Sequence, residues 1–132
     1  MTPDELLGRL SSTLRNDIGP AVADEYPRTQ AFMASVILEK VARQLALGPH
    51  HARDEAADLA ALAEALPPVL AGAPDEVAAA LAGLGGGRID AVGPLLDALY
   101  RWGHDRPAVV AALGLIRPVL RRDIDRRMEI AR

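Results

Sequence analysis

One stretch of the chain groups histidine with carboxylate residues at helical spacing. Its members are His50, His51, Asp54, Glu55 and Asp58. Each histidine has a carboxylate four residues further on, and residues four apart share one face of an α-helix. Imidazole and carboxylate groups are ligands for divalent metal ions, but a site here would need further ligands from a second helix, such as Glu39 or Asp97. The competing interpretation is a solvated helix start, where the helix dipole favours acids. We favour that interpretation and expect no bound metal or cofactor.

A second stretch, from Gly83 to Arg88, is rich in glycine. A phosphate-binding loop needs its glycines between a strand and a helix, followed by Lys and then Ser or Thr. Here Arg88 and Ile89 follow the glycines, and no strand is predicted before them. We therefore interpret residues 83–88 as a flexible hinge between helices.

The residues for nucleophilic catalysis are sparse. The chain has no cysteine, and none of Ser11, Ser12 and Ser35 lies in a strand-turn-helix elbow. His104 stands beside Asp105 in a predicted turn, where such a pair more often caps a helix than activates a nucleophile. We expect a protein that is not an enzyme and that takes no small-molecule ligand.

Composition narrows the class of partner and the compartment. The formal net charge of −3 argues against a general nucleic-acid binder. The absence of cysteine fits a reducing compartment. Asp4 and Glu5 closely follow Met1, unlike the start of a secretory signal, and no apolar run reaches the roughly 18 residues of a membrane span. We expect a cytoplasmic protein without membrane contact.

The pattern of breakers predicts an all-α fold. Half of the residues are apolar, mostly the strong helix formers Ala and Leu, and nearly all Pro and Gly residues fall where helices would begin or end. We expect one domain over residues 1–132, a compact bundle of five to six helices with an Ala/Leu-rich core and no sheet. Thr2, Pro3 and Glu5 predict a capped first helix. Gly19-Pro20 is expected to stop or kink this helix. The other expected helix ends lie at Gly48-Pro49, Pro67-Pro68, near Gly83 and at Gly103.

The helix expected over about residues 28–47 carries apolar residues on two faces. A broad arc contains Ala31, Ala34, Ile37, Leu38, Val41, Ala42 and Leu45. Phe32, Met33 and Val36 fall among the polar positions on the other side. A surface helix does not normally expose its only Phe to solvent. Either a neighbouring helix covers this second face, or a protein partner or a second copy does.

The C-terminal segment is locally basic. Arg121, Arg122, Arg126 and Arg127 alternate with Asp123, Asp125 and Glu129. Such a run is usually a solvated helix end. The alternative is a docking site for an acidic protein surface or a phosphate group, in which Arg122 and Arg126 would contact the partner.

The run from Leu14 to Ala21, with residues 31–45 and Leu47-Gly48-Pro49, resembles a family of small helical proteins of unknown function. Genes of that family are found beside acyl-CoA dehydrogenases and aminoglycoside-phosphotransferase-like kinases in actinobacteria and proteobacteria. The resemblance covers about the first 50 residues and implies a companion protein. It supplies no active-site residues.

These observations favour a non-enzymatic helical accessory module that works through protein contacts, as a homodimer or with another protein. The alternative is a small-ligand or divalent-metal-binding protein that uses the residues from His50 to Asp58. The residues expected to contact a partner are Phe32, Met33, Val36, Arg122 and Arg126.

Overall fold

A computed structural model describes all 132 residues, and every regular element in it is helical. Six α-helical segments, α1 to α6, are joined by turns and by short π- and 3-10-helical segments, and α2 has only three residues. The prediction of an all-α protein with five to six helices and no sheet is confirmed. None of the helices combines the length and apolar character that crossing a lipid bilayer requires.

The contacts within the chain group its residues in two compact units. The first contains residues 1–50 and 129–132, and the second contains residues 51–128. Helix α3 (Glu25–Val69) contributes residues to both. The single domain over residues 1–132 was expected from the length of the chain, and it stays a prediction.

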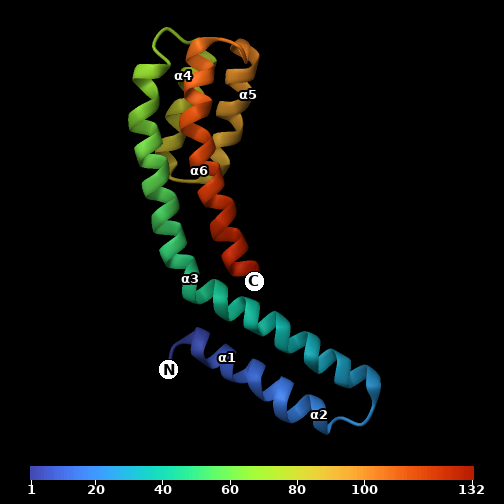
Figure 1. Ribbon diagram of the computed structural model, residues 1–132. Coiled ribbons are helices and arrows are strands. Elements are labelled where there is room, and N and C mark those ends of the chain that lie inside the picture. Colours follow the sequence, from blue (N-terminus) through green and yellow to red (C-terminus); the bar gives the residue numbers. More distant parts are fainter. The chain divides into compact units, whose positions relative to one another are not determined.

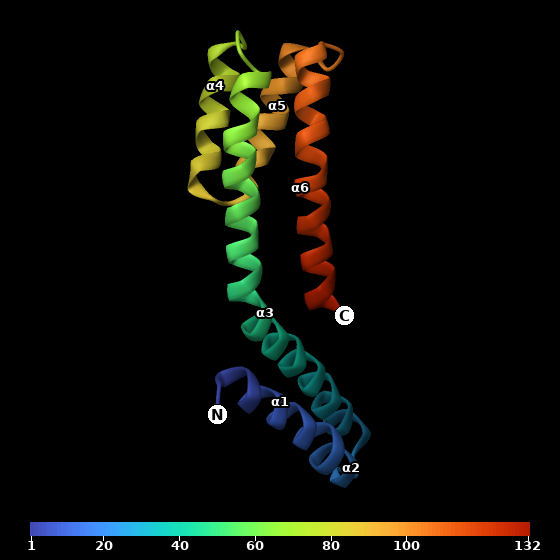
Figure 2. The same ribbon diagram turned by 60° about the vertical axis from the view of Figure 1, so that its left-hand side comes forward.

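The first unit is built on a pair of antiparallel helices, which we call the hairpin (Figures 1 and 2). One side of the pair consists of α1 (Pro3–Thr13), the π-helical segment η1 (Leu14–Ile18) and α2 (Gly19–Ala21). The other side is the part of α3 before residue 51. The predicted capping box starts the hairpin: the Glu5 amide donates to the Thr2 hydroxyl, and the Thr2 amide donates to the Glu5 carboxylate at 2.9 Å.

Of the two outcomes expected at Gly19-Pro20, a helix end or a kink, the helix end does not occur there. The chain stays helical through both residues and turns extended only at Val22, with ψ of 119°. The five residues before Gly19 form a π-helical turn, and the Gly19 amide bonds to the Leu14 carbonyl five residues back. A widened turn of this kind, next to a proline, is a known way for a helix to bend without ending.

The helix end expected at Gly48-Pro49 was wrong, because α3 runs unbroken through it for 45 residues. The end expected at Pro67-Pro68 lies just before the observed one, since α3 continues through both prolines and ends at Val69. Gly48 is not among the glycines with positive φ, so it does not form the left-handed cap that would stop the helix. Pro49 lacks an N–H and leaves one carbonyl of the preceding turn without its helical partner. The helix-forming residues on both sides outweigh that loss, and the boundary between the two units lies one residue further on, between His50 and His51.

The second unit is a bundle of four helices around an apolar core. They are residues 51–69 of α3, α4 (Asp75–Ala82), α5 (Val92–Gly103) and α6 (Pro107–Ala131) as far as residue 128, and they lie side by side in Figures 1 and 2. All buried apolar residues of the protein belong to this unit, and leucine is the commonest: Leu59, Leu62, Leu66, Leu70, Val77, Leu84, Val92, Leu95, Ala98, Leu99, Val109, Ala112, Leu113, Ile116 and Val119.

The glycine-rich segment is a packed turn. Gly83–Gly86 form one turn of 3-10 helix (η2), and a second 3-10 turn (η3) covers Ile89–Ala91. Leu84 is only 1% exposed and belongs to the apolar core, so this segment packs into the second unit through its own side chain. At Gly87 the absence of a side chain is required, because its φ of 69° lies in the left-handed region that residues with a Cβ rarely adopt.

We predict that the free energy of unfolding resides mainly in the second unit. Leu66→Ala should lower it by about 2–5 kcal/mol, since a fully buried leucine is replaced by a cavity. The matched control is Leu115→Ala on α6, whose leucine is 39% exposed and should cost under about 1 kcal/mol. Urea denaturation followed by circular dichroism measures both. Equal losses for the two variants would contradict the core described here.

Candidate partner-binding surface

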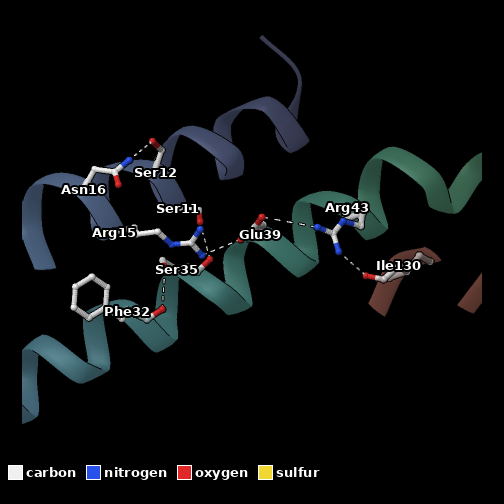
Figure 3. A network of polar contacts seen from close by, with 9 residues as sticks. All are labelled: Ser11, Ser12, Arg15, Asn16, Phe32, Ser35, Glu39, Arg43 and Ile130. Carbon is white, nitrogen blue, oxygen red and sulfur yellow. Dashed lines mark hydrogen bonds and ion pairs between the residues drawn. The ribbon is translucent and has the colours of Figure 1, made fainter. Parts of the chain in front are cut away.

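The two helices of the hairpin meet at a seam of small polar residues. The Ser11 hydroxyl donates a hydrogen bond to the backbone carbonyl of Ser35 at 2.7 Å, and both serines are buried (Figure 3). The Ser35 hydroxyl donates in turn to the carbonyl of Phe32 at 2.6 Å. Small side chains let the helix axes approach closely. Because both hydroxyls are bound to backbone carbonyls, these serines hold the seam together and neither is paired with a base that could activate it.

A glycine and an aromatic ring fit together further along the seam. A Cβ atom on Gly19 would lie 2.9 Å from the Leu14 carbonyl oxygen and 3.0 Å from the Phe32 ring. Only a residue without a side chain leaves room there for the ring. Phe32 therefore packs edge-on to the backbone of α2, although 36% of its surface stays exposed.

One side of the hairpin carries a chain of ion pairs, and we call it the charged side (Figure 3). Arg15 on η1 contacts Glu39 on α3 at 2.9 Å, and Arg43 contacts the same carboxylate at 3.8 Å. Arg43 also donates to the backbone carbonyl of Ile130 in the same unit at 3.2 Å. Ser12 accepts a hydrogen bond from Asn16 nearby. A hollow of about 220 Å³ lies here, lined by Gly8, Ser11, Ser12, Arg15, Asn16 and Glu39.

The hairpin exposes apolar side chains that nothing in its own unit covers. Not one apolar residue of the first unit is buried, because the seam is formed by Ser11, Gly19 and Ser35. Most of the large exposed apolar residues of the protein are found here: Met1, Leu6, Leu10, Ile18, Tyr26, Phe32, Met33, Val36, Ile37, Val41 and Leu45. Exposed apolar surface of this kind often marks a site of protein contact. The hairpin is therefore the strongest candidate for a functional surface.

The two apolar faces predicted for residues 28–47 are covered differently from what the sequence suggests. On the second face, Phe32 packs against Gly19 of the neighbouring helix, while Met33 and Val36 are exposed. The broad arc, expected to face the core, is only partly covered: Ile37 is 60% exposed, and Leu45 is exposed as well. The arc remains open because α3 meets α1 through Ser35, at its edge.

Arg122 and Arg126, the other expected contact residues, converge on one carboxylate inside the second unit. Both guanidinium groups bind Oδ2 of Asp58, at 3.1 Å and 3.0 Å, and the Arg126 side chain is only 13% exposed. Burial raises the pKa of Asp58, but the hydrogen bonds and positive charges of the two arginines outweigh burial and lower the pKa below its ordinary value. Both arginines thus have a structural role.

The histidine–carboxylate stretch does not assemble a metal site. No three His, Asp or Glu residues anywhere in the chain come together in a way that could hold a metal ion. Asp58 is engaged by the two arginines, and the Glu55 carboxylate accepts a hydrogen bond from the Ile89 amide at 2.9 Å. The carboxylates of this stretch join α3 to α6 and to the glycine-rich turn.

The seam itself was missed by the sequence interpretation. Ser11 and Ser35 were considered only as nucleophiles, and Gly19 only as a helix breaker. A small residue within an apolar stripe, as Ser11 is between Leu10 and Leu14, indicates close helix packing and could have located the seam. The pairing of Gly19 with Phe32 has no local signal, because it depends on how α1 and α3 are placed in register.

We predict opposite effects of adding a methyl group at two glycines of the hairpin. Gly19→Ala should destabilise the hairpin by about 1–3 kcal/mol, because the new Cβ collides with the Leu14 carbonyl and the Phe32 ring. Gly8→Ala on α1 meets nothing within 4 Å and should stabilise the helix by about 0.5–1 kcal/mol. Hydrogen exchange of the hairpin amides measures both effects. A stabilising Gly19→Ala would contradict the described packing.

We predict a pH signature for Asp58. A carboxyl group whose pKa is lowered on folding contributes stability that is complete above its unfolded pKa, near 3.8, and is lost as the pH falls through the folded value. Asp58→Asn should therefore cost about 1–3 kcal/mol at pH 7, and its difference from the wild type should shrink below pH 3.8. Urea denaturation at several pH values measures this. The control, Asp125→Asn at an exposed position of α6, should cost little at any pH; a constant difference for Asp58→Asn would contradict the ion-pair assignment.

No protein-family model, no curated protein and no solved structure matches the chain. A function for this protein must therefore be argued from the surfaces and side chains described above.

Proposed function

We propose that this protein is a non-enzymatic helical module that acts by binding another protein surface through its hairpin. One observation carries the proposal: the first unit has no buried apolar residue, yet it holds most of the exposed large apolar side chains of the protein. Apolar surface removed from water contributes roughly 25 cal/mol per Å², so a partner that covers the hairpin gains binding energy and supplies the core that the hairpin lacks.

The division of labour between the two units supports the same function. The second unit has an apolar core of its own. The hairpin has none, and it shares helix α3 with the second unit. Binding surfaces that open at low free energy and become ordered on binding are common in regulatory and accessory proteins.

The setting of the module and its compartment belong to this proposal as well. The resemblance of the first 50 residues implies a module that accompanies acyl-CoA dehydrogenases or aminoglycoside-phosphotransferase-like kinases. The absence of cysteine in 132 residues supports a reducing, cytoplasmic location.

The test compares three versions of the full chain as bait in an extract of the source cells. The wild type should retain a specific protein, which can be the endogenous copy of the chain or another one. Ile37→Glu places a charge on the exposed apolar surface of the hairpin and should abolish retention. Val110→Glu adds the same charge at an exposed valine of α6, in the second unit, and should leave retention unchanged.

Quantitative mass spectrometry of the retained proteins gives the readout. If the wild type and Ile37→Glu retain the same proteins in the same amounts, the hairpin is not a binding surface and the proposed function is wrong. Circular dichroism of each bait confirms that the helices are present.

A further inference from the structure

The two sides of the hairpin can be assigned by helix geometry. Successive residues of an α-helix are about 100° apart around its axis. Measured around the axis of α1 from Ser11, Leu10 lies about 100° away and Leu6 about 140° away in the same direction of rotation. Relative to Ser35 on α3, Leu45 and Val41 are turned about 80° and 120° in the same sense. In an antiparallel pair, equal senses point to the same side. We call this the apolar side, and its exposed residues are Leu6, Leu10, Val41 and Leu45, with Ile37 at its edge.

The ion pairs confirm this geometry independently. Arg15 and Glu39 are each turned about 40° from the seam serines in the opposite sense, and they contact each other at 2.9 Å on the charged side. Arg43, turned about 80° in that sense, contacts the same carboxylate. The charged side and the apolar side therefore lie on opposite faces of the seam.

The apolar side carries no charge over its length. Within residues 3–14 and 28–48, helical periodicity assigns no Asp, Glu, Lys or Arg to it. An uncharged surface is complementary to itself, whereas recognition of a charged partner would need opposite charges here. Residues 1–50 hold six acids and five basic residues, so two copies of the hairpin do not repel each other strongly.

The size of this side suits a stable dimer. The 19 residues from Pro3 to Ala21 span roughly 28 Å, and two helices side by side are roughly 20 Å wide. The footprint is on the order of 600 Å² before side-chain relief is added, close to the ~800 Å² that each partner contributes to a standard interface. Homodimer interfaces are also the more apolar class.

We infer that a second copy of this chain covers the apolar side. Two hairpins related by a two-fold axis place four helices around one core. In that core, Leu6 and Leu10 of one copy lie with Val41 and Leu45 of both copies. The four-helix bundle supplies the buried apolar layer that a single hairpin lacks, and leaves the charged side in water. Phe32 and Val36 lie outside this interface. The inference rests on the proposed function and names the partner within it.

The experiment uses two valines of the same helix. Val41→Glu places a carboxylate on the apolar side, and Val36→Glu makes the identical change at a valine of similar exposure, 45% against 37%, on the charged side. By multi-angle light scattering, the wild type and Val36→Glu should be dimers at tens of micromolar. Val41→Glu should be a monomer, with dimerisation at least about 100-fold weaker because a charge would be buried without a partner.

A cysteine pair keeps the test decisive if Val41→Glu fails to fold. The chain has no cysteine, so Val41→Cys and Val36→Cys each introduce a single thiol. The rate of thiol alkylation at position 41 should fall as the protein concentration rises, and the rate at position 36 should not change.

A wild type that stays monomeric at 100 µM, a dimer that Val41→Glu leaves intact, or equal sensitivity at both positions would each overturn the inference. If the purified chain is monomeric while the bait still retains another protein through Ile37, the proposed function stands and only the second copy is excluded.

Discussion

Two helices packed side by side share one seam, and every other part of their surfaces points outward. The hairpin uses its seam for Ser11, Ser35 and Gly19, residues that bring the helices close but remove little apolar area from water. Its leucines, valines and isoleucines are therefore left on the outside. In the second unit four helices enclose a common interior, and the same residue types disappear into it. The two units differ in how many apolar residues they bury because the first contains a pair of helices and the second contains four.

The ion pairs of the two units differ in how deeply they are buried. On the hairpin, Glu39 joins two arginines at a partly exposed surface, where such pairs contribute little to stability but mark one side as unsuitable for apolar contact. In the second unit Asp58 is more enclosed, and Arg122 and Arg126 offset the cost of its burial. The first arrangement joins η1 to α3 within the hairpin, whereas the second joins α6 to α3.

The helical class, the first capping box, and the helices α4 and α5 were all readable from the sequence, because they depend on local propensities and breakers. The long α3 was not. Gly48-Pro49 carries the usual signal for a helix end, and whether the helix stops depends on the energy of continuing on both sides. The exposed apolar surface of the hairpin was expected in part, from the apolar residues on two faces of residues 28–47. Which residues remain exposed could not be anticipated, because that depends on Ser35 and not Ile37 facing α1.

The placement of the core has a consequence for synthesis of the protein. All fifteen buried apolar residues lie at or beyond Leu59, and the last is Val119, so the hairpin leaves the ribosome before any core exists. At about 5–20 residues per second, the roughly 70 residues that separate the hairpin from Val119 take about 3–14 s to add. During that interval the apolar side chains of the hairpin on the nascent chain remain exposed to solvent. Neighbouring ribosomes on one messenger would present the same hairpin side by side.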